Sequence, residues 1–311
     1  IISAMLMGAI AGSAMAAASA MGSILGPEME KEGYSKEFGA AVNITAATTG
    51  LVIPPSNVLI VYSLASGGAS IAALFLAGYI PGLLTGLFLM IVAFVWAKKK
   101  GFKVGKRSSL KEVLRTFVDA LPSLFMLVVV IGGIVTGVFT ATEASAIAVL
   151  YSLLLGFFYK EISFPKLPQI LLDSSATTAI VMLLIGASMS MSWALSYENI
   201  PQEISAGLLG ISENEIVILL IINLLLLFVG IFMDMTPAVL IFTPIFLPVV
   251  TKLGLDPVHF GIIMVLNLCI GLCTPPVGSV LFVGVGIAKT SIEKVVKPLL
   301  PLFLAMLLAL F

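Results

Sequence analysis

The sequence predicts an all-α protein that crosses a membrane several times and is built as an inverted repeat around two broken helices. Of its 311 residues, 60% are hydrophobic and 10% are charged, whereas an ordinary soluble domain carries about 25% charged residues. Several apolar runs exceed the ~20 residues that a helix needs to cross a bilayer. Two apolar segments, far apart in the chain, each contain adjacent prolines. These interrupt a helix because proline lacks an N–H and clashes with the preceding turn.

The charged residues and the cysteines narrow the possible functions. Lys and Arg number 16, as do Asp and Glu, so the net charge gives no basis for nucleic-acid binding. Cys269 and Cys273 lie in one apolar segment with no histidine close by. This favours small apolar side chains over a metal site. No residue pattern requires covalent chemistry, and we expect no enzymatic activity.

The first part of the chain predicts one broken helix and one uninterrupted membrane-spanning helix. Residues 1–25 are apolar and rich in Gly, Ala and Ser, a composition that allows close helix packing in lipid. A polar loop at 27–37 precedes the first broken segment, 38–66, and a clean span covers 71–96. The segment 98–107 then holds six of the 16 basic residues. Because short loops rich in Lys and Arg stay in the cytoplasm, this segment fixes the predicted topology.

The middle of the chain predicts three further spans. Residues 116–138 lead outward, 141–158 return, and 167–195 lead outward again. The loop 198–215 has four Glu and no Lys or Arg, which agrees with a position outside the membrane.

Residues 216–250 predict a re-entrant hairpin. Two short apolar arms of about 17 and 13 residues meet at 233–237, and each is shorter than the ~20 residues of a membrane-spanning helix. We therefore expect this hairpin to enter the membrane from outside and to return there. The second broken segment would then end in the cytoplasm near Lys289, Lys294 and Lys297.

An internal repeat relates the two broken segments. At a separation of 221 residues, Gly and Pro recur together, and Ser13 falls opposite Asp234. The loops before the two segments are predicted on opposite sides, so the repeat is inverted, as in many secondary transporters. Two unrelated proline kinks are the alternative. The matching pairs are Pro27–Pro248, Lys31–Lys252, Gly33–Gly254, Gly50–Gly271, Leu51–Leu272, Pro54–Pro275 and Pro55–Pro276.

The breaks are the predicted binding region. An inverted repeat brings the two breaks and the two hairpin tips together near mid-membrane. Unwound carbonyls at 50–53 and 271–274 are hard oxygen ligands for a small cation, and half-helix N-termini favour an anionic group. Together they suggest cation-coupled uptake of a carboxylate. Nearby hydroxyls are those of Ser13, Ser56, Thr236 and Thr274.

A few other polar residues stand in apolar surroundings. A carboxylate within the membrane, such as that of Asp234, has a high free-energy cost, so Asp234 is a candidate functional residue. Its alternative role is to cap the arm that starts at Pro237. Glu143 either forms a capping box with Thr140 or acts as a gating or coupling acid. Asn43 either contacts the ligand or makes hydrogen bonds between helices.

With these residues in view, the chain resembles the large membrane subunit (DctM- or SiaM-like) of tripartite ATP-independent periplasmic (TRAP) transporters. The most specific segment is NLCIGLCTPPVG at 267–278. Family members are longer at the N-terminus, so the resemblance implies that an N-terminal part is missing. The other matching segments are 12–13, 22–29, 50–56, 75–82, 140–144, 199–201, 233–234 and 256–261.

The resemblance implies a sodium-driven carrier of the elevator type in a bacterial or archaeal inner membrane. A periplasmic binding protein would deliver a small organic anion, such as a C4-dicarboxylate or a sugar acid. A small four-helix membrane subunit (DctQ- or SiaQ-like) would complete the complex. Two or more Na⁺ sites are implied. A stand-alone sodium/carboxylate symporter is the alternative; an ion channel and an intramembrane protease are less favoured.

The resemblance also implies site residues. One sodium site would use Ser13, Gly50, Ile53 and Pro55; the other would use Gly230, Asp234, Gly271, Leu272 and Thr274. The substrate candidates are Ser13, Asn43, Ser56, Asn57, Thr236, Pro276 and Gly278. Two departures affect these expectations. The first hairpin tip reads Ala-Gly-Ser-Ala at 11–14 instead of Ser-Gly-Ser-Ser, and Tyr197 replaces a common Arg before Glu198.

The same reasoning assigns different parts of the chain to a transport domain and to a scaffold. Residues 1–68 would form one half of a transport domain and 198–290 the other half. Residues 69–197 would form the scaffold and connecting helices, and 291–311 a C-terminal helix.

Overall fold

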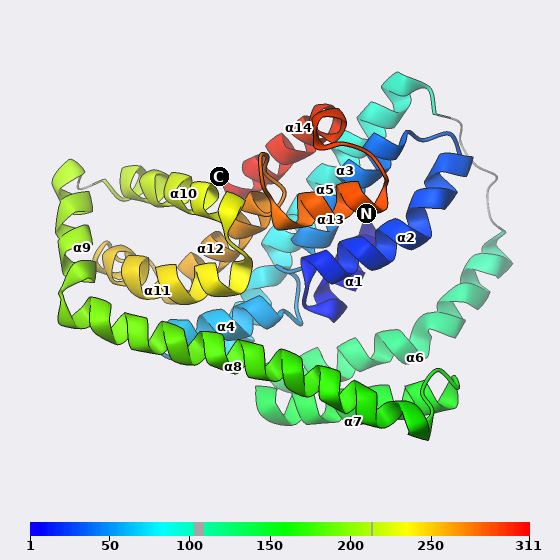
Figure 1. Ribbon diagram of the computed structural model, residues 1–311, viewed down its shortest axis with the longest axis horizontal. Helices are drawn as coiled ribbons and strands as arrows, with labels where there is room; N and C mark the ends of the chain where they lie inside the picture. The colour runs from blue at the N-terminus through cyan, green and yellow to red at the C-terminus, as the bar shows by residue number, and fades with distance from the viewer. Residues whose placement is uncertain (103–108, 213) are drawn as a thin grey trace. The chain divides into compact units, whose positions relative to one another are not determined.

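The protein is a multi-pass α-helical membrane protein. Its structure, a computed structural model, describes residues 1–102, 109–212 and 214–311, and every regular element in these ranges is a helix (Figure 1). Six of the described helices are long and apolar enough to cross a membrane. They are α5 (Ile71–Lys100), α6 (Leu110–Val135), α7 (Ala141–Phe158), α8 (Leu167–Tyr197), α10 (Glu215–Phe232) and α11 (Met235–Lys252).

The chain forms two compact units, each of which is described by itself. The first combines Ile1–Val104 with Met191–Phe311, and the second is Gly105–Ser190. All the predicted hairpin and break residues belong to the first unit, whereas Glu143 belongs to the second. Much of the basic segment 98–107 lies outside the described residues.

The first hairpin consists of α1 (Ile2–Ala11) and α2 (Ala14–Lys31), and its tip is at Gly12 and Ser13. Gly12 closes α1 in the left-handed conformation (φ 62°), which glycine adopts without steric cost. Ser13 begins α2, and its hydroxyl accepts a hydrogen bond from Ala16 N (3.3 Å). The chain therefore reverses at the two residues that the repeat placed opposite the second hairpin tip.

Both helix breaks occur where the adjacent prolines predict them. The first separates α3 (Lys36–Thr49) from α4 (Asn57–Ala65), and the second separates α12 (Pro257–Gly271) from α13 (Ser279–Ile287). Tight turns close each break: Ile53 N donates to Gly50 O (3.2 Å), and Thr274 N donates to Gly271 O (2.9 Å). These two bonds occupy equivalent positions of the repeat.

The second hairpin corrects the predicted arm lengths. Helices α10 and α11 are both 18 residues long, instead of about 17 and 13. Helix α11 starts before Pro237 because proline is tolerated in the first helical turn, and it continues through Pro244 and Pro248. Each arm thus meets the length for a membrane span. That the hairpin is re-entrant stays a prediction.

A second correction concerns the polar loop predicted at 198–215. It contains a helix, α9 (Ile200–Ile211), whose face with Pro201, Ser205 and Leu208 is buried. Positions separated by three or four residues share one face of a helix. This face packs on α11, and Lys252 Nζ donates to Ser205 Oγ (3.3 Å). The acidic residues of the segment concealed this pattern.

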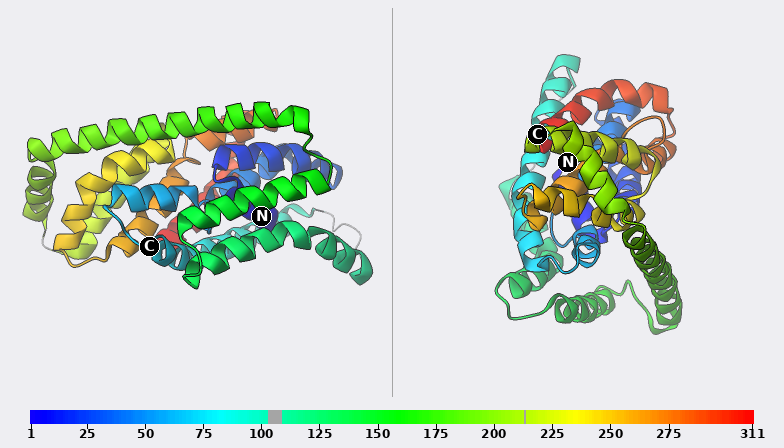
Figure 2. Two further views of the ribbon diagram at one scale, coloured as in Figure 1. Left: turned by 90° about the horizontal axis from the view of Figure 1, so that it is seen from below. Right: turned by 90° about the vertical axis from the view of Figure 1, so that its left-hand side faces the viewer.

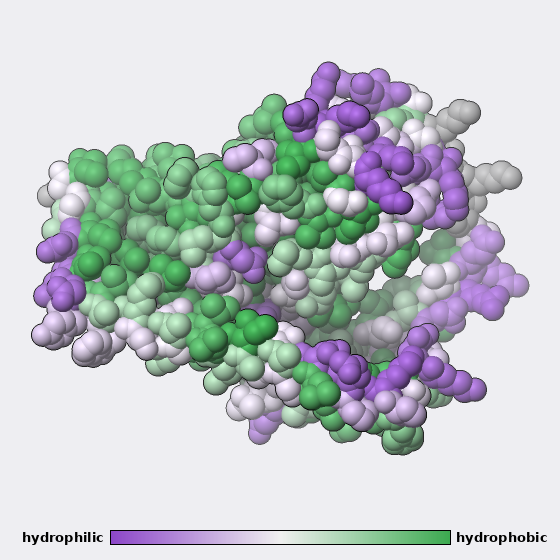
Figure 3. Space-filling view, in the orientation of Figure 1, coloured by the Kyte–Doolittle hydropathy of each residue, from purple (hydrophilic) through white to green (hydrophobic). Residues whose placement is uncertain are grey.

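The hairpins and broken helices pack together within the first unit. Helices α10, α11 and α12 lie side by side (Figures 1 and 2), and α1 and α2 pack in the same way on α3. Helix α14 (Ile292–Leu310) packs on α3 and α5. Hydrophobic residues cover α10 and α11, and hydrophilic ones gather where α2 turns into α3 (Figure 3).

In the second unit, α6 and α7 form a pair joined by a short turn. Tyr151 Oη donates to the carbonyl of Pro122 (2.7 Å). This hydrogen bond joins the two helices of the pair directly. A 3₁₀ turn at Phe164–Lys166 then leads into α8.

Candidate functional site

The first hairpin meets the first break through two glycines. A Cβ placed on Gly50 would collide with the Met5 carbonyl and lie 2.8 Å from Gly8 Cα. A Cβ placed on Gly8 would lie 2.5 Å from the Ala47 carbonyl. The backbones of α1 and α3 are therefore in direct contact, which any larger residue would prevent.

The second hairpin meets the second break in the same way. A Cβ on Gly271 would lie 2.6 Å from Gly230 Cα, and a Cβ on Gly230 would lie 3.1 Å from Gly271 Cα. Gly278 N also donates to Ile231 O (3.0 Å), which ties the far side of the break to the end of α10. Each hairpin thus holds the backbone of the break that follows it.

The two breaks meet each other at equivalent positions of the repeat. Cys269 Sγ donates to the carbonyl of Thr48 (3.1 Å) across 221 residues, and Thr48 Oγ1 lies 3.1 Å from Cys273 Sγ. The three residues are fully buried. The predicted apolar role of the cysteines was thus incomplete, because both also hydrogen-bond at the crossing.

The broken helices run antiparallel to each other. Where α4 ends, Tyr62 Oη donates to Pro257 O at the start of α12 (2.6 Å). Where α3 starts, Glu37 Oε1 accepts from Thr290 Oγ1, just beyond the end of α13 (3.4 Å). These two contacts, with the crossing between them, are the arrangement that an inverted repeat requires.

Backbone oxygens gather at the second break. A Cβ on Gly278 would lie 2.8 Å from the Leu272 carbonyl oxygen and 3.0 Å from that of Thr274, so both oxygens face one small space. Gly278 has φ 48° and is buried. Neutral oxygens suit a hard cation such as Na⁺. In the described residues, no group of three or more His, Cys, Asp or Glu could hold a metal, so a cation here would be held mainly by carbonyls.

The first break offers fewer free carbonyl oxygens than predicted. Gly50 O accepts from Ile53 N, and Leu51 O accepts from Ser56 Oγ. The Val52 carbonyl faces α5, because a Cβ on Gly78 would lie 2.5 Å from it. Each carbonyl oxygen keeps a second lone pair, so Gly50 and Ile53 stay candidate ligands.

The side chains of the tips and breaks have different surroundings. Asp234 is the N-cap residue of α11, but its carboxylate accepts no capping hydrogen bond and is exposed. The capping alternative for this side chain is therefore wrong. Ser56, in contrast, is buried and caps α4 by accepting from Leu59 N (3.3 Å). Asn57 follows it and lies against the first tip, since a Cβ on Gly12 would lie 3.2 Å from Asn57 Cβ.

The other predicted residues divide by location. Thr236 lies in the first turn of α11 and is half-buried, while Pro276 is exposed on the second break. Glu143 forms the capping box with Thr140, whose N–H and hydroxyl both donate to it (2.8 Å each). The capping interpretation is confirmed, and a coupling role for Glu143 stays a prediction. The ligand roles of all these residues also stay predictions.

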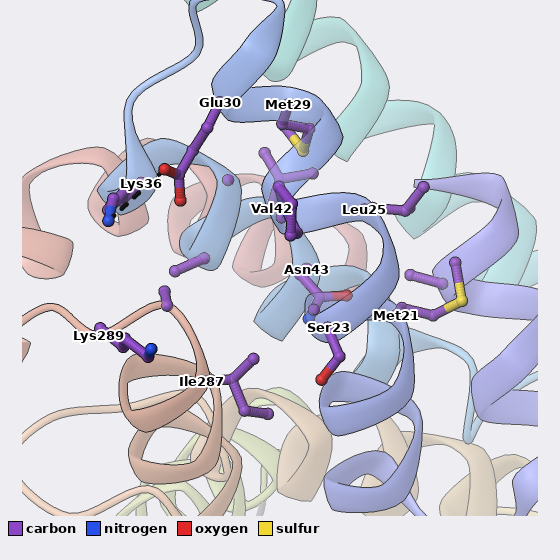
Figure 4. A pocket seen from close by; sticks show the side chains of 18 of the residues that line it. Met21, Ser23, Leu25, Met29, Glu30, Lys36, Val42, Asn43, Ile287 and Lys289 are labelled. Atoms are coloured by element: carbon purple, nitrogen blue, oxygen red, sulfur yellow. Dashed lines mark ion pairs between the residues drawn. The ribbon is translucent and has the colours of Figure 1, made fainter.

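Asn43 occupies a separate place, a cavity of about 370 Å³ bounded by α2, α3 and α13 (Figure 4). Asn43 Nδ2 donates to Ala18 O (2.7 Å), but its buried Oδ1 has no partner among the described residues. No break residue lines this cavity. The predicted substrate residues are therefore not all at one site.

Gly8 and Asn223 were not singled out from the sequence. Gly8 lies in a run of small residues, and only the backbone contact distinguishes it from its neighbours. Asn267 Nδ2 donates to Asn223 Oδ1 (2.6 Å), and the Oδ1 of Asn267 has no partner among the described residues. Asn223 stood out in a long apolar run and was detectable as a buried polar residue.

The chain matches the family model described as "Tripartite ATP-independent periplasmic transporter, DctM component" over residues 1–311. It is 62% identical to the uncharacterized protein YgiK of Salmonella typhimurium, over 97% of this chain and 69% of the relative. It is 44% identical to the isethionate TRAP transporter permease protein DctMQ of Oleidesulfovibrio alaskensis, over 98% of this chain and 48% of the relative. It is 39% identical to the C4-dicarboxylate TRAP transporter large permease protein DctM of Pseudomonas aeruginosa, over 99% of this chain and 72% of the relative.

Proposed function

Because the chain belongs to the DctM family of TRAP transporter components, we propose that it forms part of a large permease that couples the uptake of a small organic anion to a sodium gradient. The named relatives support the substrate class, since isethionate and C4-dicarboxylates are both small organic anions. The chain spans about half of the first of these relatives, 48%. The substrate of the complete protein is therefore part of the proposal.

The contact between the two breaks is the observation that carries this proposal. Two interrupted helices cross at Thr48 and Cys269, and each break lies against the hairpin that precedes it. Interrupted helices place polar backbone inside a membrane protein, where it is tolerated only if it is buried or lines a cavity. In transporters such breaks hold the ion and the substrate.

Sodium would bind to backbone oxygens at each break. The Leu272 and Thr274 carbonyls that face Gly278 supply hard ligands for one ion, and Asp234 at the adjoining tip would add a charge. Gly230 and Gly271 keep the backbones close enough to form this site. The first site would use Ser13, Gly50, Ile53 and Pro55. The sodium gradient would supply the driving force for uptake, and the residues named here would hold the ion.

The substrate would bind where the tips and breaks meet. Candidate contacts are Ser13, Ser56, Asn57, Thr236, Pro276 and Gly278. The N-terminal ends of α4 and α13 start at the two breaks, and a helix N-terminus favours an anionic group. Asn43 lies in a different cavity and is left out of this set.

The proposal includes partners and movement. A periplasmic binding protein would deliver the anion, and a small four-helix membrane subunit would complete the complex in the inner membrane. The hairpins and broken helices would move together as the carrier of an elevator mechanism. Residues 1–68 and 198–290 would form that carrier, and the helices of 69–197 would form most of its support.

Uptake by the complete transporter in proteoliposomes tests this function. We expect saturable uptake of labelled isethionate or succinate only when a sodium gradient and the cognate binding protein are both present. Uptake without the binding protein would instead favour a stand-alone symporter. Uptake that does not saturate, or that ignores the sodium gradient, would contradict a coupled carrier.

A further inference from the structure

The cavity between α2, α3 and α13 has two polar features that lack partners. At one side, Asn43 Oδ1 is buried without a hydrogen-bond donor among the described residues, although Asn43 is only 9% exposed. A buried acceptor without a donor has lost its hydration and gained no hydrogen bond in return. At the other side, Lys289 lines the cavity, is exposed, and forms no ion pair with any described residue.

The charges of the cavity favour an anion. Its charged side chains are those of Glu30, Lys36 and Lys289. Glu30 and Lys36 pair with each other (3.5 Å), so their charges largely cancel. Lys289 leaves an excess positive charge, and Figure 4 shows it approaching the cavity from the end of α13.

Lys289 also occupies a position that favours glycine. Its φ is 49°, and it follows α13 in a turn in which Thr290 N donates to Val285 O (3.2 Å). Glycine is the usual residue at this place because a Cβ is strained there. After α4, the same place in the turn, directly following the C-cap residue, is taken by Gly67 (φ 80°), one residue out of the 221-residue register. The two repeats thus differ at this place in the turn, and the lysine belongs to the second repeat, whose turn lines the cavity.

Conformation alone does not assign a role to Lys289. Lys160, after α7, has the same left-handed conformation (φ 60°) and lies far along the chain in the second unit. The unpaired charge and the unpaired acceptor in one cavity are what distinguish Lys289. Lys160 therefore provides a matched control for both the strain and the charge.

We propose that this cavity binds a small hydroxy acid, with Lys289 holding its carboxylate and Asn43 Oδ1 accepting a hydrogen bond from its hydroxyl. An anion without a hydroxyl would leave Asn43 Oδ1 without a donor, and a neutral alcohol would leave Lys289 without a counter-charge. About 370 Å³ accommodates an acid of six carbons. The site is separate from the breaks, so the proposal goes beyond the sodium-coupled function and does not require it.

Titration calorimetry in sodium-free buffer tests this site with two probes of equal chain length. D-Glucarate and adipate are both six-carbon dicarboxylates and differ in their hydroxyl groups. We expect wild-type protein to bind glucarate more tightly than adipate. Lys289→Gly should weaken glucarate binding at least about tenfold, as the loss of a charged hydrogen bond implies, and Lys289→Arg should preserve it.

Two controls separate the proposal from a structural effect. Lys160→Gly and Lys289→Gly should raise the melting temperature similarly, because both relieve a strained φ, but only Lys289→Gly should weaken glucarate binding. Asn43→Leu should remove the preference for glucarate over adipate. If this variant fails to fold, the comparison of Lys289→Gly with Lys160→Gly still tests the proposal. Equal binding of the two acids, or equal effects of the two glycine substitutions, would overturn the proposal.

A third variant distinguishes this site from the proposed sodium-coupled one. Asp234→Ala should leave sodium-free glucarate binding unchanged, because Asp234 does not line the cavity. If this substitution abolishes glucarate binding, the acid binds at the tips and breaks. That result would overturn the cavity proposal and leave the proposed function standing.

Discussion

At the scale of single residues, glycine is required where two backbones touch. Gly50 and Gly271 occupy equivalent positions, and each lies against the backbone of a hairpin arm. We expect Gly50→Ala or Gly271→Ala to lower stability by about 2 kcal/mol, because a new methyl group must displace backbone atoms. Thermal unfolding in detergent measures this loss.

The control is Gly132→Ala in α6. Gly132 is also helical, but a Cβ there meets no atom within 4 Å. The alanine should then stabilise the helix by a few tenths of a kcal/mol to about 1 kcal/mol. Similar melting temperatures for all three variants would contradict the close contact between the hairpins and the breaks.

Two aspartates at helix N-termini, one that caps its helix and one that does not, allow a capping role to be distinguished from an ion-binding role. The Asp256 carboxylate accepts hydrogen bonds from Val258 N (2.8 Å) and His259 N (3.3 Å), whereas the Asp234 carboxylate accepts no capping hydrogen bond. Asp256→Ala should therefore cost about 1 kcal/mol of stability. Asp234→Ala should leave stability unchanged and should reduce sodium-dependent uptake several-fold.

Melting temperature and uptake measured on both variants check this prediction. Sodium-dependent uptake that survives in Asp234→Ala would remove Asp234 from the proposed sodium site. A loss of stability in that variant would restore a structural role that its geometry does not support.

Residue chemistry could be predicted from the sequence only where the signal is local. Asp234 stood out because a carboxylate is rare in an apolar run, and Glu143 because Thr140 precedes it by three residues. Gly8 and Cys269 carried no such signal, since their importance depends on contacts with residues far away in the chain. Periodicity and composition do not contain these contacts.

At the scale of helices, the breaks were predictable and the arms were not. Adjacent prolines act on their own turn, so both interruptions followed from the sequence. The length of α11 did not, because the predicted arm starts at Pro237, whereas the helix starts at Met235 and includes Pro237 in a first turn that tolerates it. Helix α9 was missed because its buried face matters only once α11 packs against it.

The crossing of the two breaks can be tested by a cross-link. Thr48 Oγ1 lies 3.1 Å from Cys273 Sγ, so a thiol at position 48 would place two sulfur atoms within reach of a disulfide. We expect Thr48→Cys, combined with Cys269→Ser, to link the two halves of the chain under oxidation. A protease site inserted between 98 and 107 reveals the link, because the cleaved halves then stay together on a non-reducing gel.

Thr45→Cys in the same background is the control. Its hydroxyl bonds to Ala41 and Val42 of its own helix, and we expect no link to Cys273. If neither variant forms a cross-link, or if both do so equally, the two breaks do not face each other as described.

At the scale of the whole molecule, the contacts determine the relative direction of the two repeats, and the basic residues predict which side faces the cytoplasm. Tyr62 with Pro257, and Glu37 with Thr290, show that the broken helices are antiparallel. The orientation rests on basic residues: three lysines end α5, at positions 98–100, and Lys289, Lys294 and Lys297 lie at and after the end of α13. Because Lys and Arg collect on the cytoplasmic side, both groups of lysines predict that the same end of the repeat lies inside.

Lys31 and Lys252 provide the sharpest test of this orientation, because they occupy equivalent positions of the repeat and are both exposed. An inverted repeat places them on opposite sides, with position 31 in the cytoplasm and position 252 outside. With Cys269 and Cys273 replaced by serine, a membrane-impermeant maleimide should label Lys252→Cys in spheroplasts and should label Lys31→Cys only after the membrane is permeabilised. Labelling of both positions from outside would mean that the two hairpins enter from the same side. A carrier that exposes its site alternately through two opposed hairpins would then be impossible for this chain, even though its breaks would still cross.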